Sequence, residues 1–360
     1  MENEFIRGKA STLSGMPPEE LAALLAPLPR FRAGQMCKWI AAGAASFDAM
    51  HNIPLQLRKE LAEQFALRPR VTCTPHCGSD GTVKLAIELA DGALIEAVLL
   101  ADSSGRHTAC ISTQAGCPAG CVFCKTGAAF LRNLDSAEIV EQFLLLRAAA
   151  AKSVESAAAP EALPIANIVI MGMGEPLLNL EELRRSLAVI CCAEGLHFSR
   201  RRITVSTCGI AEGITSLADS GPLVRLALSL TTADESLRQR LMPITVHQPL
   251  KRVKEALRHY QGVSGDRITL EAVLLGGINT RNEDAERIAE FAQGLDAAVN
   301  LIPWNPVKGL EFEGKPLRQP HAAEIESYSR RLTALGLKVT RRYRRGRGIM
   351  GACGQLGNNQ

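Results

Sequence analysis

Residues 108–127 read TACISTQAGCPAGCVFCKTG, an apolar strand-like run that leads into a glycine-rich loop. The loop carries Cys117, Cys121 and Cys124 in a C-x3-C-x2-C spacing. Thiolates suit zinc or iron–sulfur clusters, and both usually take four protein ligands. A set of three predicts a four-iron cluster with one iron left open for a substrate or cofactor.

The alternation of strand and helix continues along the chain. Predicted strands cover residues 108–113, 165–171, 202–207, 223–230, 267–275 and 298–304. Helical patterns alternate with them at 136–151, 179–194, 249–260, 282–295 and 321–336. This order predicts an α/β fold with a parallel sheet. Six strands are too few for an eight-stranded barrel, so we expect a partial (β/α)6 barrel.

Short motifs follow each predicted strand. The three cysteines follow the first strand, GMGEP (172–176) the second and TCG (207–209) the third. TTADE, GGINT and PWNP (303–306) follow the fourth, fifth and sixth. Because ligands bind at the carboxyl ends of parallel strands, these loops predict one active-site face.

The flanking regions differ from this core in composition. We expect residues 1–95 to form a small accessory domain, with helices broken at Gly43 and Pro54 and then strands joined by SDG and DG turns. Residues 96–340 would form the core, with a surface linker at 152–164. Residues 341–360 would form a basic, glycine-rich tail that carries Cys353.

Composition limits the class of protein. The 360 residues are 46% hydrophobic and 22% charged, enough for a sizeable core. No apolar run is long enough to span a membrane and the N-terminus has no apolar signal region, which predicts a soluble cytoplasmic protein. Eleven cysteines in such a protein favour metal binding or reactivity over disulfides. The CTPHC segment (73–77) could be half of a zinc site, but no second pair of ligands accompanies it.

The net charge of +4 indicates a nucleic-acid partner only weakly. Arginines are concentrated in SRRRIT (199–204) and TRRYRRGRG (340–348). A solvated strand end explains such runs equally well. Next to Cys353, the second run, which includes Arg341, Arg342, Arg344, Arg345 and Arg347, predicts phosphate contacts where a base would enter.

The cysteine spacing, with Phe123 before the third cysteine, resembles the radical S-adenosylmethionine enzymes. Further motifs closely resemble the adenine-C2 RNA methyltransferases of that class, which act on 23S rRNA and tRNA. In chain order they are CISTQAGC (110–117), FLRNL (130–134), GMGEPLLN (172–179), VSTCG (205–209), SLTT (229–232), MPI (242–244), LIPWN (301–305) and ACGQL (352–356). The resemblance covers residues from about 90 to 356, and it implies that the N-terminal region is a small RNA-handling domain.

The resemblance implies a 4Fe–4S cluster on Cys117, Cys121 and Cys124, with S-adenosylmethionine on the open iron. It also implies an electron donor such as flavodoxin or ferredoxin, and a monomer. The positions that match the family's cofactor contacts are Gly174, Glu175, Ser206, Ser229, Leu230 and Asn305, with Thr231 where the family has histidine.

Cys353, Cys110 and Glu96 match the family's catalytic residues. C2 of adenine is electron-poor, so direct methyl transfer from a sulfonium fails. The resemblance implies that one S-adenosylmethionine methylates Cys353 and that a second supplies a 5′-deoxyadenosyl radical. This radical would take a hydrogen from the methyl group, and the resulting carbon radical would add to C2. Glu96 would then remove the C2 proton, and Cys110 would release the base by forming a disulfide with Cys353.

The sequence also departs from the family pattern. Besides Thr231, Cys208 stands where serine is expected, and the segment after Cys124 is about one residue short, so its loop need not close in the same way. Two alternatives stay open. One is the antibiotic-resistance branch that methylates C8 of a ribosomal adenine with the same cysteines. The other is a non-catalytic iron–sulfur or zinc protein that binds RNA.

Overall fold

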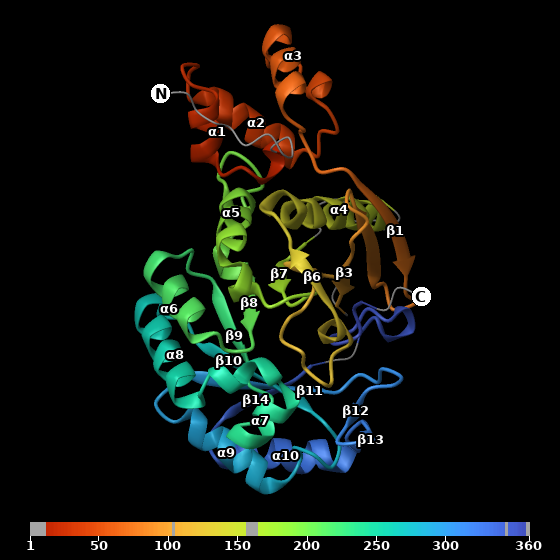
Figure 1. The fold of residues 1–360 in the computed structure, drawn as a ribbon, viewed down its shortest axis with the longest axis vertical. Coiled ribbons are helices and arrows are strands. Elements are labelled where there is room, and N and C mark those ends of the chain that lie inside the picture. Colours follow the sequence, from red (N-terminus) through yellow and green to blue (C-terminus); the bar gives the residue numbers. More distant parts are fainter. Residues whose placement is uncertain (1–11, 103–104, 156–164, 343–344, 358–360) are drawn as a thin grey trace.

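The N-terminal part of the protein is a helical lobe, as predicted. The computed structural model describes residues 12–102, 105–155, 165–342 and 345–357. Pro18 is the first residue of the first helix, where a ring-fixed φ and a missing N–H are tolerated, and Pro54 directly precedes the third helix. The lobe (residues 12–67) lies at one end of the molecule (Figure 1) and contains α1 (Pro18–Leu24), α2 (Phe31–Ala41) and α3 (Leu55–Gln64).

The lobe is fixed to α4 (Ser136–Glu155), the first helix of the core. Arg68 binds the buried carboxylate of Glu141 through two hydrogen bonds of 2.8 and 2.5 Å. The Ser136 hydroxyl donates to the Gly15 carbonyl at 2.6 Å. α4 continues into the predicted linker as far as Glu155, so the prediction was wrong for that part; residues 156–164 lie outside the described residues.

Ten strands form one mixed sheet in the order β1-β2-β3-β4-β7-β8-β9-β10-β11-β14. The pairs from β1 to β4 are antiparallel, whereas all pairs from β4 to β14 are parallel. The antiparallel strands are β1 (Val71–Cys77), β2 (Val83–Leu89) and β3 (Leu94–Ala101). The parallel ones are β4 (His107–Cys110), β7 (Asn167–Ile170), β8 (Ile203–Thr207), β9 (Arg225–Ser229), β10 (Ile268–Leu274), β11 (Ala297–Pro303) and β14 (Lys338–Arg341).

The partial α/β barrel is therefore confirmed, with all six predicted strands, and β14 adds a seventh parallel strand. The sequence pattern missed β14 because its four residues, KVTR, are short, basic and mostly exposed at the sheet edge. Among the strands of the described residues, β14 pairs with β11 alone. The predicted domain boundary at residue 95 falls within β3, which pairs with both β2 and β4; that division stays a prediction.

Helices cover the parallel strands (Figure 1). The five predicted helices are confirmed as α4, α5 (Leu180–Cys191), α8 (Leu250–Ser264), α9 (Asn282–Ala292) and α10 (Ala322–Ala334). Two further helices, α6 (Ala211–Ser220) and α7 (Glu235–Leu241), were not predicted. α6 contains Gly213, Thr215 and Ser216, which are weak helix formers, and α7 has only seven residues.

The core lies between these helices and the strands. Val205, Leu226, Leu228, Leu270 and Leu301 are at most 1% exposed, as parallel strands covered by helices require. Two small pairs lie outside the main sheet: β5 (Gln114–Gly116) with β6 (Phe130–Asn133), and β12 (Glu311–Phe312) with β13 (Lys315–Pro316). Within the described residues, no helix has the length and apolar character needed to span a bilayer.

The C-terminal tail (residues 345–357 as described) returns to the β1–β3 side of the sheet (Figure 1). The Gly346 amide donates to Asp80 at 2.7 Å, and the Gly357 amide donates to Glu96 at 2.6 Å. The Thr126 hydroxyl donates to the Leu356 carbonyl at 2.9 Å. The glycine-rich tail is therefore docked against the barrel.

Candidate functional site

The three cysteines lie on one closed loop, residues 117–124 (the cysteine loop), between β5 and η3 (Lys125–Ala128). Gly116 has φ +82°, and a Cβ there would lie 2.1 Å from the Ala129 carbonyl oxygen, so only glycine fits. The Cys117 amide donates to that same oxygen at 2.8 Å, and the Cys124 amide donates to the Cys121 carbonyl at 3.1 Å. These contacts bring the two ends of the motif together.

Two later segments support the cysteine loop from outside. The Val122 amide donates to the Leu241 carbonyl at the end of α7, at 3.0 Å. The Trp304 indole donates to the Phe123 carbonyl at 2.8 Å. Residues more than a hundred positions apart in the sequence therefore hold the loop at the carboxyl ends of the strands.

The thiols of the cysteine loop are electrostatic neighbours of one another. Burial, and then the thiols of Cys124 and Cys117, raise the pKa of Cys121 well above its ordinary value. Burial raises the pKa of Cys117 to about 12. A thiolate at these positions therefore needs a compensating cation, which iron supplies on binding, and three converging thiols fit a cluster with one open iron. Among the described residues, no three His, Cys, Asp or Glu side chains are gathered closely enough to hold a single metal ion.

Gly174 and Glu175 adjoin the cysteine loop. Gly174 has φ +110°, and a Cβ there would lie 2.7 Å from the Gln114 side chain. Glu175 is 4% exposed and accepts hydrogen bonds from the amides of Leu177 (3.1 Å) and Cys208 (2.7 Å). Burial raises its pKa. When ionised, this carboxylate favours a cationic group, such as an ammonium, beside Cys117 and Cys121.

Ser206 and Ser229, from two separate motifs, lie together on neighbouring strands, with their hydroxyl oxygens 3.1 Å apart. Leu230 and Thr231 are instead fully buried. Thr231 has φ +61°, and its hydroxyl is without a hydrogen-bond partner among the described residues. The hydroxyls of Ser206 and Ser229 are thus half-buried, whereas the side chains of Leu230 and Thr231 are not accessible.

Cys110 and Cys353 line one cavity of about 840 Å³, within the size range of small-molecule sites. Burial raises the pKa of Cys110 to about 12, and the nearby Cys353 adds to this effect. Asn305 also lines the cavity, and its amide donates to the Cys353 carbonyl at 3.1 Å. Arg342 interacts electrostatically with Cys353, Glu271 and Cys110. Its guanidinium also donates to the Met171 sulfur at 3.6 Å.

The cavity continues through the barrel to the starts of the strands, where Thr108, Asn167, Thr204, Arg225, Thr269, Ala298 and Lys338 line it. The cysteine loop, Gly174, Glu175, Ser206 and Ser229 are not among its lining residues. Cys353 connects the two regions, because it is also an electrostatic neighbour of Cys124. The predicted residues thus form two adjoining groups rather than one pocket.

Glu96 lies beneath the tail and is fully buried in β3. One of its oxygens is 2.7 Å from the ammonium of Lys84 on β2, and the other accepts from the Gly357 amide. Lys84 is itself 6% exposed. In this state Glu96 is a paired carboxylate that holds the tail.

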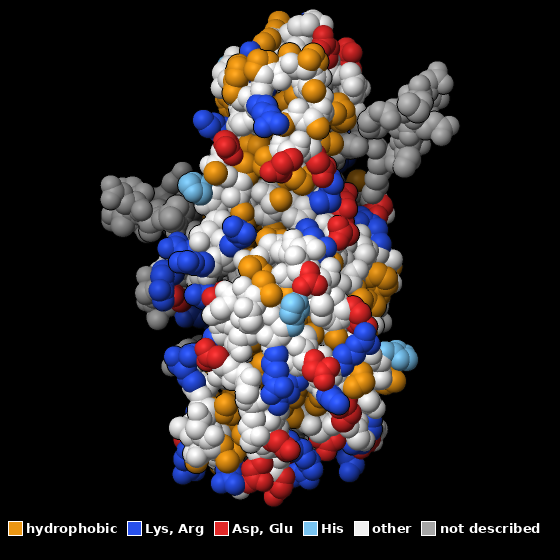
Figure 2. Space-filling model, turned by 90° about the vertical axis from the view of Figure 1, so that its left-hand side faces the viewer, with side chains coloured by type: hydrophobic (Ala, Val, Ile, Leu, Met, Phe, Trp, Pro, Cys, Tyr) orange, Lys and Arg blue, Asp and Glu red, His pale blue; other side chains and the backbone are white. Residues whose placement is uncertain are grey.

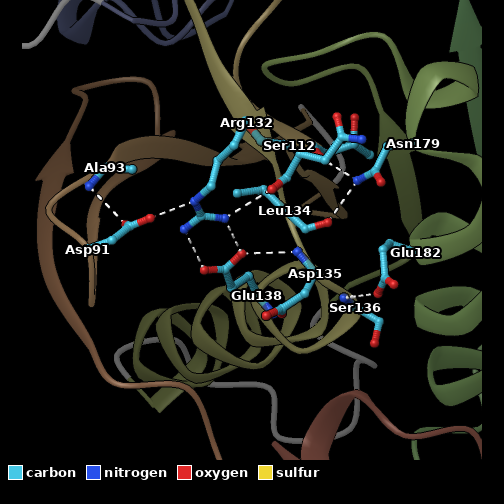
Figure 3. A network of polar contacts seen from close by, with 12 residues as sticks. Asp91, Ala93, Ser112, Arg132, Leu134, Asp135, Ser136, Glu138, Asn179 and Glu182 are labelled. Atoms are coloured by element: carbon cyan, nitrogen blue, oxygen red, sulfur yellow. Dashed lines mark hydrogen bonds and ion pairs between the residues drawn. The ribbon is translucent and has the colours of Figure 1, made fainter. Parts of the chain in front are cut away.

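A polar network fixes the hairpin on which the cysteine loop is mounted (Figure 3). Arg132 on β6 binds Asp91 at 2.6 Å and both carboxylate oxygens of Glu138 at 2.8 Å. The Asn179 amide donates at 2.8 Å to the carbonyls of both Thr113 and Leu134. The FLRNL and GMGEPLLN motifs therefore also have a structural role in supporting the loop.

The arginine-rich segments are distributed differently from the prediction. Arg200, Arg201 and Arg202 are exposed at the start of β8. Arg341 pairs with Glu326 at 2.5 Å, and Arg342 turns into the barrel cavity, so neither is the free phosphate contact that was predicted. Arg345 is half-buried and lines the cavity; Arg344 lies outside the described residues, as does the side chain of Arg347.

The surface charge is mixed on the face that Figure 2 shows. Lys and Arg side chains alternate there with Asp and Glu over the barrel. Apolar side chains gather on the N-terminal lobe at the top of the view, and exposed apolar residues of that lobe include Leu28, Phe31 and Leu55. No single-sign patch dominates this face.

Two residues of the site, Lys84 and Arg238, were not predicted, and Arg342 was predicted only as a phosphate contact. The DG turn at 91–92 sets the hairpin register that places Lys84 diagonally from Glu96, so Lys84 was within reach of sequence reasoning. Arg238 lies in the unpredicted α7, and Arg342 follows the unpredicted β14.

Known proteins resemble this chain along almost its whole length. Residues 111–292 match the Radical SAM superfamily and residues 12–67 match the ribosomal RNA large subunit methyltransferase N-terminal domain. The chain is 45% identical to a probable dual-specificity RNA methyltransferase RlmN of Treponema pallidum (strain Nichols), covering 96% of this chain and 97% of that protein. It is 39% identical to the dual-specificity RNA methyltransferase RlmN of Anaeromyxobacter dehalogenans (strain 2CP-C), with 96% and 91% covered.

A solved structure, that of a radical SAM methyltransferase from Sphaerobacter thermophilus, matches with a TM-score of 0.86 at 38% identity. The match covers 96% of this chain and 99% of that one. The similarity therefore includes the lobe, the barrel and most of the tail.

Proposed function

Because the chain belongs to the dual-specificity RNA methyltransferase RlmN family of radical SAM enzymes, we propose that it methylates C2 of adenine in 23S rRNA and in tRNA. The observation that carries the proposal is the pair of thiols, Cys110 and Cys353, on one cavity. A simple electron carrier has no need of two reactive thiols beside its cluster. A zinc-binding module has no need of them either.

In this proposal, Cys117, Cys121 and Cys124 hold a 4Fe–4S cluster, and S-adenosylmethionine occupies the open iron. Bound together, they would supply the one-electron chemistry that yields a 5′-deoxyadenosyl radical. Glu175 would lie close to the ammonium of the cofactor, and Ser206, Ser229 and Asn305 would offer hydrogen-bonding groups to it. Leu230 and Thr231 would shape the site only through their backbone, since both side chains are buried.

Cys353 would carry the methyl group as a thioether after acting as a thiolate nucleophile towards the first S-adenosylmethionine. Arg342 is an electrostatic neighbour of Cys353 and places a positive charge near its sulfur. After the methyl carbon has joined the base, the radical adduct would give one electron to an acceptor such as an oxidised iron–sulfur cluster. Cys110 would then attack the Cys353 sulfur, and the disulfide would form as the carbon–sulfur bond breaks. The departing carbon would keep the electron pair of that bond and take up a proton, which completes the methyl group. Both thiols must therefore face the same space, as their shared cavity allows.

Glu96 would act as the base that takes the C2 proton. The ammonium of Lys84 lies 2.7 Å from this buried carboxylate and is its ion-pair partner. The bond from Gly357 to Glu96 means that the end of the tail must release the carboxylate before it can act. The adenine would also have to leave its stack to reach the cavity.

The test is to express Cys110→Ala with native RNA and analyse both products. A protein–RNA adduct through Cys353 is expected to accumulate, because the resolving thiol is missing. Mass mapping of RNA from the wild-type reaction would place the methyl group at C2. Intact methylation by Cys110→Ala without an adduct would contradict the two-thiol scheme, and a methyl group at C8 would assign the chain to the resistance branch. Cys77→Ala, on an exposed strand, is the matched control.

The remaining partners follow from the family and stay predictions. They are an electron donor such as flavodoxin or ferredoxin, a monomeric state and a cytoplasmic location. For the RNA, Arg345 is the described member of the basic tail segment that lies at the cavity. Reversing the charges of Arg344 and Arg345 is expected to weaken RNA binding and to reduce its dependence on salt.

A further inference from the structure

Arg238 on α7 is the largest side chain that the fold buries completely, at 1% exposure. Its Nε donates to the Leu230 carbonyl at 3.2 Å, and its Nη2 donates to the Cys208 carbonyl at 2.5 Å. Its Nη1 is buried and has no hydrogen-bond partner among the described residues. One nitrogen of this buried guanidinium, Nη1, therefore has no acceptor among the described residues.

The guanidinium also lacks a carboxylate partner. Among the described residues, no Asp or Glu oxygen lies within ion-pair distance of Arg238, whereas the buried carboxylates of Glu96 and Glu141 each have a cationic partner. Glu235, on the same helix, affects the pKa of Arg238 less than the thiols do and accepts from the Leu250 amide. An unpaired buried cation costs several kcal/mol, so a compensating anion is expected.

The surroundings identify where that anion belongs. Cys121 and Cys208 are the strongest electrostatic partners of Arg238, and Cys121 is one of the three thiols of the cysteine loop. α7 is joined to that loop, because the Leu241 carbonyl accepts from the Val122 amide at 3.0 Å. The helix that carries Arg238 thus lies directly against the segment that would carry the cluster.

We propose that Arg238 is the counter-charge of the iron–sulfur cluster, with its free Nη1 directed at the thiolate and sulfide sulfurs on the Cys121 side. The inference rests on the proposed cluster at Cys117, Cys121 and Cys124. Three thiolates give the cluster a net negative charge, and reduction makes it more negative. A fixed cation stabilises the reduced form more than the oxidised form, so Arg238 raises the reduction potential and eases electron entry.

The test uses the full-length protein, reconstituted anaerobically, as wild type, Arg238→Gln, Arg238→Lys and Arg184→Gln. Glutamine keeps an amide donor for the carbonyls but removes the charge, and lysine keeps the charge. Arg184 is the matched control, because it also donates to two backbone carbonyls, those of Gly221 and Ser216, without contact with the cysteine loop. The readouts are iron and sulfide content, the midpoint potential by redox titration, and thermal unfolding of the cluster-free forms.

We expect Arg238→Gln to lower the reduction equilibrium constant about tenfold or more, a shift of about 59 mV to more negative potential for one electron. Arg238→Lys is expected to recover most of this loss, and Arg184→Gln to match wild type. Without the cluster, Arg238→Gln should be at least as thermostable as wild type, because it no longer buries an unpaired charge. A second outcome would support the same role: Arg238→Gln protein that is folded but does not retain a cluster, while Arg184→Gln protein retains one.

A full cluster with an unchanged potential in Arg238→Gln would overturn the inference and leave the proposed function intact. The inference would also be overturned if cluster-free Arg238→Gln were unfolded or less stable than cluster-free wild type. In that case the role of Arg238 would be limited to its hydrogen bonds with the two backbone carbonyls. A wild-type protein that takes up no iron and sulfide would overturn both proposals together.

Discussion

The two groups of cysteines in the active region are built in opposite ways. The cysteine loop is local: three thiols within eight residues, closed by backbone bonds to Ala129 and by a glycine that no other residue can replace. The pair Cys110 and Cys353 comes from β4 and from the tail, and its geometry depends on Asn305 and on the docking of the tail. If the proposed function holds, cofactor binding would use thiols from one short motif, whereas the methyl-transfer step would need two thiols that the fold brings together from distant parts of the chain.

The largest effect is expected from removing a thiol of the cysteine loop. Cys117→Ala should abolish cluster uptake and all methylation, because the cluster would lose one of three protein ligands. Iron and sulfide analysis and the loss of brown colour would measure it, with Cys77→Ala as the control that keeps both. A colourless, zinc-loaded wild-type protein would contradict the cluster assignment.

Glu96→Gln is expected to lower the methylation rate by about 10²- to 10⁴-fold, the usual range for a lost general base. It should also destabilise the fold by about 3–5 kcal/mol, because Lys84 would be left buried without its partner. The double variant Lys84→Met with Glu96→Gln should recover stability without recovering activity. If the double variant regained activity too, Glu96 would have only a structural role.

Alkylation would distinguish the Cys110 thiol from ordinary thiols. With a pKa of about 12, against an ordinary value of 9.0, Cys110 should hold roughly a thousandfold less thiolate near neutral pH. Because burial raises this pKa, reaction with iodoacetamide should be slow at pH 8 and rise about tenfold per pH unit towards pH 11. Peptide mapping would follow Cys110 against the exposed Cys77, and equal rates at pH 8 would show that Cys110 is accessible.

The smallest effect is expected from Asn305→Ala, which removes one bond to the Cys353 carbonyl. Loss of a buried hydrogen bond costs about 1–3 kcal/mol, so the docked tail should become less populated while the cysteine loop stays unchanged. Hydrogen exchange of the tail amides would measure the change. Unchanged protection would mean that Glu96, Thr126 and Pro306 hold the tail without Asn305.

The sequence predicted most of the barrel because apolar periodicity and capping are local signals. It missed β14, α6 and α7, where the elements are short or use weak formers and depend on tertiary packing. The cysteines and, through the resemblance, Glu96 stay predicted site residues, but the sequence did not show which charged side chains lie beside them. The partners come from other strands and loops: Lys84 pairs with Glu96, Arg238 binds the Cys208 carbonyl, and Arg342 is an electrostatic neighbour of Cys353. Their burial was not evident from the local sequence.

The most direct test of the central claim is to map the disulfide that forms when anaerobically purified protein is treated with diamide, which takes up the two electrons and two protons of two thiols. Because Cys110 and Cys353 line one cavity, we predict a Cys110–Cys353 cross-linked peptide as the main product, unchanged in Cys77→Ala. A product in which Cys353 pairs with another cysteine, or none that contains Cys353, would contradict the claim that these two thiols form one site.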